Sequence, residues 1–254
     1  GDDAATDIPE AEWAYARQIA AAEDLIGGPI ADGEIGDFLI GNHKVRFVIQ
    51  GMDAPRTLLP YGGTVIDADV VRGPGEPGQD RLVELGSVAG YIRLVRPTKI
   101  EVHQSGRNGR PAIIRVTGVD GGMPLIDTIL PLGSSELAVQ IDYILEPGAT
   151  SLRIETTYTS LSESGGARSV KPGDALVMAD LLTLCTAPTP GCDENDPPLR
   201  PDWITAHHKN DVAYAYYATG EPARVELQRD DLWLLTAPGL SLAPLESGTY
   251  TRYL

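Results

Sequence analysis

The stretch LAVQIDYILEPGATSLRIETTYTSLS, residues 137–162, decides the fold of this chain. Apolar side chains largely alternate with polar ones on both sides of Pro147 and Gly148. A period of two places one set of side chains on a buried face and the other toward solvent or a second layer. Pro147 presets a negative φ and Gly148 accepts a positive φ, which suits a tight turn. The stretch therefore predicts a long β-hairpin at the centre of a large antiparallel sheet. Its expected buried row comprises Val139, Ile141, Tyr143, Leu145, Leu152, Ile154, Thr156 and Tyr158.

The composition agrees with an all-β protein. Hydrophobic residues make up 42% of the 254 residues, but aromatic residues only 6%, so Val, Ile and Leu must form most of the core. The 28 glycines and 20 prolines are typical of many short strands joined by turns. So many antiparallel strands cannot remain one flat open sheet. We therefore expect a large antiparallel two-sheet sandwich or supersandwich with one N-terminal helix at residues 9–26, where Pro9 suits a first helical turn and Gly27 and Gly28 end the pattern.

The domain organisation follows from where regular patterns begin and end. Residues 1–8 are polar and are expected to form a disordered tether, whereas residues 9–254 are expected to form a single β-sandwich domain. Within it, residues 36–49 predict two strands about a turn at Asn42, and residues 123–131 predict a further strand. The last segment, SGTYTRYL, alternates up to Leu254 without a polar tail. This ending predicts that the domain is the N-terminal part of a longer chain, whose following domain would be its partner.

The net charge of −16 limits the binding partners. Such an acidic surface repels nucleic acids and anionic membranes, and no apolar run is long enough for direct membrane insertion. We expect a protein that is secreted, periplasmic or at the cell surface. The start GDDAATDIPE would fit the tether that follows the lipidated cysteine of a bacterial lipoprotein. An alternative reading of the acidic surface is that it collects cations, notably Ca²⁺.

The two cysteines, Cys185 and Cys192, lie close together in the sequence. The loop between them is short enough to close, so we expect a disulfide that stabilises the fold by roughly 2.5 kcal/mol. A disulfide implies an oxidising compartment. The alternative is a pair of free thiols in a cytosolic protein.

Residues of the central hairpin resemble the galactose-mutarotase-like β-supersandwich, namely Tyr143, Leu145, Gly148, Leu152, Ile154 and Thr159. Ser160 lies where that pattern carries Asn. The chain is also similar to the N-terminal β-domain of bacterial surface proteins that carry a metallohydrolase domain of the CehA/McbA kind. The segments that carry this likeness are residues 36–49, 62–70, 80–85, 109–118 and 171–178. The resemblance implies a supersandwich fold and a hydrolase domain that is not in this chain, because no His-x-His metal motif occurs.

Histidines are the first candidates for a binding site. A mutarotase-type enzyme, which the resemblance implies as an alternative, needs an acid histidine and a base carboxylate that face each other across a cleft. His103, His208 and Asp211 could fill these roles, but their spacing selects none of them. His207 and His208 are neighbours on an expected strand and point to opposite faces, which disfavours a shared metal ion. We therefore assign no catalytic residue.

Acidic side chains are the candidates for a cation site. Asp193, Glu194, Asn195 and Asp196 offer consecutive oxygen ligands, and Asp193, Asn195 and Asp196 would be the ligands of a Ca²⁺ ion. The alternating spacing of known calcium loops is missing, so a solvated acidic turn is the favoured interpretation. Asp67 and Asp69 share one face of an expected strand and could also bind a cation, although we expect them to face water.

Tyr214 and Tyr216 share one face of a strand in AYAYYATG, residues 213–220. Aromatic side chains on a sandwich face can stack on sugar rings, so these two are the candidate carbohydrate-binding residues. The favoured alternative is that this face packs into the core with its hydroxyl groups hydrogen-bonded. Taken together, the sequence predicts a non-catalytic structural or recognition domain of a secreted or cell-surface bacterial protein, which supports a C-terminal hydrolase domain. The alternatives are a mutarotase-like enzyme and a glycan-binding module.

Overall fold

The computed structural model describes residues 8–52, 56–90, 93–129, 136–179, 183–186, 199–208, 212–229 and 232–254. Its strands are β1 (Tyr15–Gln18), β2 (Phe38–Gly41), β3 (Val45–Ile49), β4 (Val65–Val70), β5 (Leu82–Gly90), β6 (Arg93–Ser105), β7 (Ala112–Gly122), β8 (Leu137–Leu145), β9 (Arg153–Ser160), β10 (Arg168–Val170), β11 (Gly173–Met178), β12 (Thr183–Thr186), β13 (Ile204–His208), β14 (Val212–Ala218), β15 (Arg224–Arg229), β16 (Leu232–Thr236), β17 (Leu240–Leu242) and β18 (Ser247–Tyr253). The helical elements are the 3₁₀ turns η1 (Glu10–Glu12), η2 (Ala22–Asp24) and η3 (Arg107–Gly109) and the short helix α1 (Pro124–Ile129). Within the described residues, no helix is long and apolar enough to cross a membrane.

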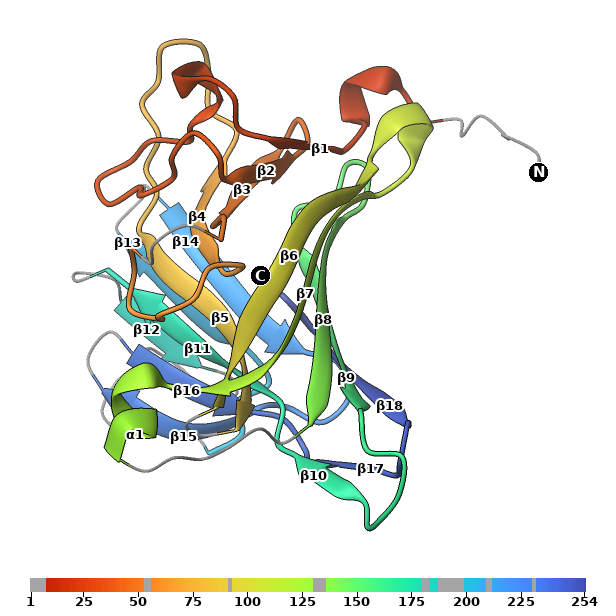
Figure 1. The fold of residues 1–254 in the computed structure, drawn as a ribbon. Coiled ribbons are helices and arrows are strands. Elements are labelled where there is room, and N and C mark those ends of the chain that lie inside the picture. The colour runs from red at the N-terminus through yellow and green to blue at the C-terminus, as the bar shows by residue number, and fades with distance from the viewer. Residues whose placement is uncertain are drawn as a thin grey trace.

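Sixteen of these strands form one antiparallel sheet, which branches and folds over on itself (Figure 1). The main path runs β1-β2-β3-β4-β5-β6-β7-β8-β9-β18-β14-β13-β12. The branch begins at β5, which also pairs with β11, and continues through β16 to β15, while β10 and β17 form a separate pair. Hydrogen bonds between side chains and backbone join β8 and β9 to β5 and to the segment before β4, so these strands face each other as two layers. The predicted all-β, sandwich-like architecture is confirmed.

The central hairpin forms in the expected register. β8 pairs with β9 from Leu137 opposite Ser160 to Ile144 opposite Arg153, and Gly148 adopts a φ of 65° in the turn. Every member of the expected buried row is buried. Two of its tyrosines also anchor the opposite layer: the Tyr143 hydroxyl donates to the Gly63 carbonyl at 2.6 Å, and the Tyr158 hydroxyl donates to the Val88 carbonyl at 2.7 Å. The hairpin therefore supplies both the core side chains and the polar links across the sandwich.

A buried ion pair between Arg252 of β18 and Asp174 of β11 lies between the layers. The side chains of Arg252 and Asp174 are 1% and 0% exposed, and Arg252 Nη2 lies 2.7 Å from Asp174 Oδ1. Arg252 Nε also donates to Asp174 Oδ1 at 3.1 Å. The remaining guanidinium N–H groups donate to Thr156 Oγ1 at 2.6 Å, to the Ile154 carbonyl at 3.3 Å and to Ser87 Oγ. Burial opposes the charged form of Arg252, yet the Asp174 carboxylate raises the pKa of Arg252 above its usual value. Arg252 is therefore a charged group whose donors are all satisfied in the core.

Two tyrosines complete the surroundings of Asp174. The Tyr216 hydroxyl of β14 donates to Asp174 Oδ2 at 2.8 Å, and it lies 2.6 Å from the Tyr250 hydroxyl of β18. Burial raises the pKa of Tyr216 well above its usual value, so its hydroxyl keeps its proton. The polar network thus joins β5, β9, β11, β14 and β18.

The predicted N-terminal helix at residues 9–26 is wrong. The segment contains the turns η1 and η2 with β1 between them, and β1 pairs with β2 from Tyr15 opposite Gly41 to Gln18 opposite Phe38. Ala16 packs in the main core, whereas Ile19 packs in a second cluster with Leu39, Val48 and Ile66. As a strand, this segment pairs with the otherwise open edge of β2 and buries apolar side chains on both faces of the sheet. A helix lying on the sheet would bury side chains on only one of its faces.

The other local predictions had mixed outcomes. The hairpin about Asn42 is confirmed as β2 and β3, and Asn42 Oδ1 accepts the backbone N–H of Lys44 at 2.8 Å to hold the turn. The predicted strand at residues 123–131 is wrong, because residues 124–129 form α1. Pro124 has no N–H for a strand ladder and suits a first helical turn. Residues 1–7 lie outside the described residues, so the predicted tether stays a prediction.

Replacing Arg252 with Met is expected to destabilise the protein by about 3–5 kcal/mol, because Asp174 would remain buried without its counter-charge. Urea unfolding at pH 7 measures this change. Arg153→Met is the matched control on the neighbouring β9, since the Arg153 side chain is 31% exposed and pairs with Glu155 at the surface. We expect the control to cost less than about 1 kcal/mol. Equal losses in the two variants would contradict the central role of the buried pair.

Candidate functional site

A cleft opens between the β3–β4 pair and β14, beside Leu254. Its volume is about 340 Å³. Val45, Phe47 and Ala68 form an apolar part of the lining, and four consecutive residues of β14, residues 212–215, line it along the strand. Thr150 and Ser151, in the turn of the central hairpin, lie at its border. The cleft therefore combines apolar side chains with strand backbone.

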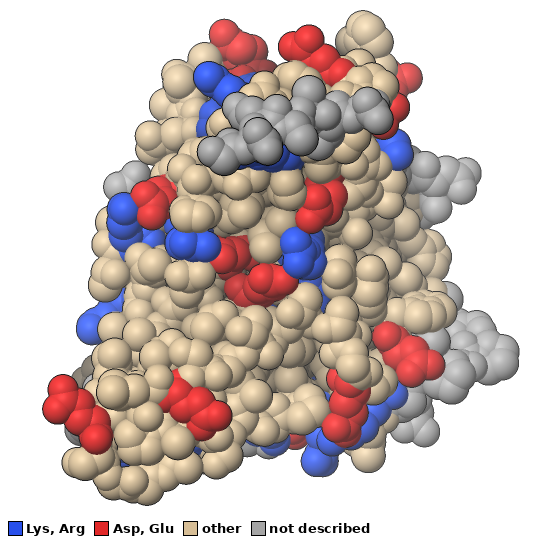
Figure 2. Space-filling view, turned by 90° about the vertical axis from the view of Figure 1, so that its right-hand side faces the viewer, with Lys and Arg blue, Asp and Glu red and all other residues tan. Residues whose placement is uncertain are grey.

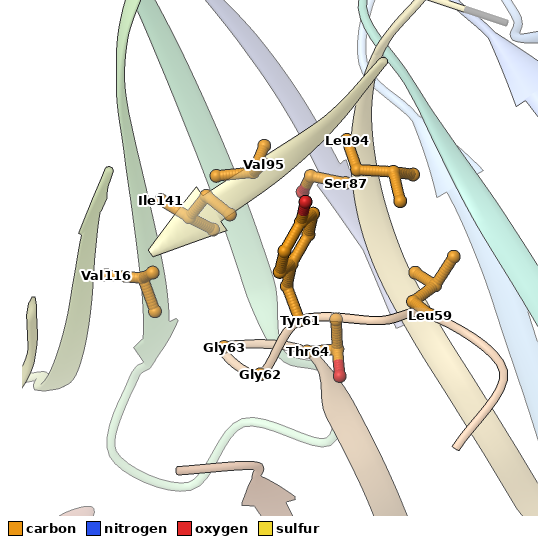
Figure 3. A pocket seen from close by; sticks show the side chains of 10 residues that line it. All are labelled: Leu59, Tyr61, Gly62, Gly63, Thr64, Ser87, Leu94, Val95, Val116 and Ile141. Carbon is orange, nitrogen blue, oxygen red and sulfur yellow. The ribbon is translucent and has the colours of Figure 1, made fainter. Parts of the chain in front are cut away.

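A second hollow lies inside the sandwich, and it is too small to be a substrate site. Figure 3 shows side chains of β5, β6, β7 and β8 and the loop before β4 converging on it, with Tyr61 and Thr64 on the loop side. Its volume is about 10 Å³, which is at most the space for one water molecule.

On one side of the cleft, side chains occupy the backbone groups of β4 beyond Val65, the one residue at which β4 pairs with β5. The backbone N–H of Ala68 donates to Asp80 Oδ1 at 2.8 Å, and the Tyr214 hydroxyl donates to the Ala68 carbonyl at 3.0 Å. The Tyr214 hydroxyl also accepts the Arg81 N–H at 2.8 Å. Farther along β4, the Val70 N–H donates to Asp69 Oδ1 at 2.8 Å. These contacts occupy groups that another strand would otherwise pair with.

The carboxyl groups of Asp67 and Asp80, beside this part of β4, are buried and differ in their pKa values. Burial raises the pKa of Asp80 to about 8, and the nearby Asp67 adds to this rise. Asp80 Oδ2 has no hydrogen-bond partner among the described residues, which favours a proton there. Burial also raises the pKa of Asp67 to about 6, although Asp67 accepts the N–H groups of Asp32 and Gly33. The expectation that Asp67 and Asp69 face water is wrong: they are 1% and 4% exposed.

Tyr214 and Tyr216 do not form the predicted sugar-binding platform. They are 7% and 2% exposed, and their hydroxyl groups are held by Ala68 and Asp174, respectively. Their rings point inward because β14 alternates buried and exposed residues in that phase. The interpretation that this face packs into the core is the correct one.

The two candidate histidines lie on strands that do not pair. His103 is exposed on β6, at a bulge where Val102 pairs with Ile114 and Gln104 with Ile113. His208 is buried at the end of β13, opposite Val212. Five strands separate β6 from β13 along the sheet.

Several other predicted residues lie outside the described part of the chain, namely Cys192, Asp193, Glu194, Asn195, Asp196 and Asp211. The calcium loop and the disulfide therefore stay predictions. Cys185 itself lies on β12, with its Sγ 3.8 Å from His207 Nδ1. Among the described residues, no group of three or more His, Cys, Asp or Glu side chains could hold a metal ion.

One exposed aromatic feature was missed from the sequence. Tyr217 of β14 lies directly opposite Tyr253 of β18, and their rings stack with centroids 4.8 Å apart and an angle of 5° between the planes. Tyr217 is 38% exposed and lines one end of the cleft. The alternation of AYAYYATG places Tyr217 on the face opposite Tyr216, but its partner on β18 could be found only from the strand register.

The outer face of β6–β9 carries both charges. Arg115 pairs with Asp142 at 2.7 Å and Arg153 pairs with Glu155 at 2.7 Å, across or along these strands. Figure 2 shows acidic and basic side chains lying close together on this side of the molecule instead of forming a patch of one sign. This face therefore offers no concentrated charge to an ionic partner.

Comparison with known proteins gives no family. No protein-family model matches the chain. No curated protein matches it either. Among solved structures, it is similar to the crystal structure of a TPR-domain containing protein from Parabacteroides distasonis, with 11% sequence identity and a TM-score of 0.47. The match covers 85% of this chain and 46% of that chain, so this chain spans less than half of that protein's length.

Asp80→Asn is expected to weaken the pH dependence of stability between about pH 4 and pH 8. The pKa of Asp80 is about 8 in the folded state against 3.8 ordinarily, so the folded state binds more protons in this window. The stability that neutral Asp80 contributes is therefore full below about pH 4. This contribution is lost as the pH rises toward 8, by about 1.4 kcal/mol for each pH unit. Asn resembles the protonated acid and removes this loss. Urea unfolding at pH 5 and pH 8 measures it, and identical pH profiles for the two proteins would contradict the assignment.

Proposed function

We propose that this chain is a non-catalytic recognition domain, which also serves as a structural support within a secreted or cell-surface bacterial protein. The cleft beside β14 is the observation that carries this proposal. Its described lining is mostly apolar side chains and strand backbone, and its carboxylate, Asp69, is held by Arg72 through bonds of 2.7 and 2.8 Å. A carboxylate engaged on both oxygens by a guanidinium is suited to holding structure, not to accepting a proton from a substrate.

The structural part of the proposal rests on the polar links between the layers of the sandwich. The Arg252 network and the tyrosine bonds from the central hairpin link the two layers at several points. The resemblance to the N-terminal β-domain of surface proteins with a CehA/McbA-like hydrolase domain suggests that a further domain is what it supports. The acidic composition and the cysteine pair agree with a location outside the cytoplasm.

The non-catalytic assignment is tested against mutarotase-like chemistry. We expect α-D-glucose and α-D-galactose to reach anomeric equilibrium at the same rate with the protein as in buffer, followed by ¹H NMR. The reason is that His103 and His208 lie on strands that do not pair, so no acid histidine and base carboxylate meet across the cleft among the described residues. An acceleration that disappears in His103→Ala or His208→Ala would overturn the proposal.

A glycan is the second candidate ligand, favoured by the exposed Tyr217–Tyr253 stack. The outer ring face of such a pair can pack on the apolar face of a sugar. This candidate replaces Tyr214 and Tyr216, which are buried, by the aromatic residues that reach the surface.

If a glycan binds at this stack, Tyr217→Ala should weaken binding about two- to tenfold, which corresponds to the loss of one aromatic contact of about 0.5–1.5 kcal/mol. A glycan array identifies the sugar, and titration calorimetry measures the change. Tyr61→Phe serves as the control, because Tyr61 lies inside the sandwich and donates to the Gly122 carbonyl. Unchanged binding by the Tyr217→Ala protein would remove this candidate.

A further inference from the structure

A separate pocket lies where the segment before β2 meets the start of β5 and the end of β11. Its volume is about 380 Å³, within the range of small-molecule sites. It shares none of its described lining residues with the cleft beside β14. The residues that matter here are Ile30, Asp32, Arg56, Arg81, Val83 and Met178.

Two opposite charges line this pocket without pairing. Arg81 and Asp32 are half-buried, and neither side chain takes part in an ion pair or a hydrogen bond within the described part of the chain. An unpaired arginine is notable in a protein whose acidic residues outnumber its basic ones by 36 to 20. Arg81 Nε is enclosed without an acceptor, so this charge can be compensated only through the terminal nitrogens, which reach the pocket.

Hydrogen bonds hold the backbone of both charged residues. The N–H of Asp32 donates to Asp67 Oδ1 at 2.8 Å. The N–H of Arg81 donates to the Tyr214 hydroxyl at 2.8 Å, and the Arg81 carbonyl accepts the N–H of Ala179 at 3.0 Å. The two side chains therefore extend from fixed positions on different elements, and a ligand between them would meet a largely preformed site.

The second guanidinium in the pocket is already neutralised. Arg56 Nη1 lies 2.6 Å from Glu34 Oε2, and Arg56 Nη2 lies 2.5 Å from Asp37 Oδ2. One positive charge, on Arg81, and one negative charge, on Asp32, remain for a ligand. A simple anion would be attracted by Arg81 and repelled by Asp32, and a simple cation would meet the reverse. A ligand that carries both charges would satisfy both residues.

We propose that this pocket binds a small zwitterion with the chemistry of a free aliphatic α-amino acid. The ligand carboxylate would accept hydrogen bonds from the terminal nitrogens of Arg81, and the ligand ammonium would donate to the Asp32 carboxylate. The aliphatic side chain would pack on Ile30, Val83 and Met178. This site goes beyond the proposed recognition function and does not depend on the cleft beside β14.

The test titrates the ¹⁵N-labelled protein with L-leucine and follows the backbone amides by NMR. The titration runs to about 20 mM, which reveals even a millimolar dissociation constant. We expect the amide signals of Asp32, Arg81 and Ala179 to shift together and to saturate. The amide of Gly148, in the turn of the central hairpin, should not shift.

Two analogues of leucine separate a zwitterion from simpler ligands. N-acetyl-L-leucine lacks the ammonium group, and L-leucinamide lacks the carboxylate. Each should bind about tenfold more weakly than leucine or weaker still, because one charge in the pocket would stay unpaired. Equal binding of leucine and either analogue would contradict the proposal.

Matched variants assign the two contacts. Arg81→Gln should remove the preference for leucine over leucinamide, and Asp32→Asn should remove the preference for leucine over N-acetyl-leucine. Both variants keep the backbone hydrogen bonds of the site. Arg153→Gln is the control, since Arg153 pairs with Glu155 at 2.7 Å on the outer face and should leave the binding of all three compounds unchanged. If a variant does not fold, the comparison of leucine with its analogues still decides the question.

The absence of any shift at the pocket amides up to the highest leucine concentration overturns the inference, because the two charges are then hydrated by water alone. Preferences that persist in both variants overturn it as well. None of these results bears on the anomeric-exchange or glycan measurements, so a failure here is distinguishable from a failure of the proposed function.

Discussion

The ion pair between Arg252 and Asp174 is the constraint on which the arrangement of the layers depends. A charged pair with both side chains fully buried is tolerated only when its remaining hydrogen-bonding groups are satisfied. Satisfying Arg252 requires Thr156 and Ile154 from β9 and Ser87 from β5, each at a defined position. A slip of any of these strands would leave a buried charge or donor without a partner. The pair therefore selects one register for the sandwich, whereas its aliphatic core residues alone would tolerate several.

The same chemistry closes the edges of the sheet. β2 would be an open edge without β1. β4 pairs with β5 only at Val65, and farther along, at Ala68, Asp80 and Tyr214 occupy the backbone groups in place of a strand. The cost is a buried carboxylate whose pKa rises to about 8, so Asp80 is neutral over much of the acid range.

The sequence predicted what local pattern controls and missed what strand pairing controls. The central hairpin was predictable because Pro147 and Gly148 mark the turn and the period of two marks the faces. Tyr217 was not predictable as a surface residue with a partner, because its neighbour Tyr253 is distant in the sequence and is placed by register. The segment around Ala16 has a helical spacing of apolar residues, but the edge of β2 recruits it as a strand. Asp80 shows no signal in the sequence, since its role depends on the open edge of β4.

The register between β14 and β18 follows from the buried ion pair. Arg252 lies opposite Ala218, so the position of Arg252 sets how far β18 advances along β14. Moving β18 forward by two residues would keep the faces of its side chains and change its partners on β14. The same move would carry the guanidinium about 7 Å along the strand, away from Asp174. Leaving Asp174 unpaired costs several kcal/mol, more than two added backbone hydrogen bonds return. The core charge thus fixes the register of β18 on β14 as well as on β9.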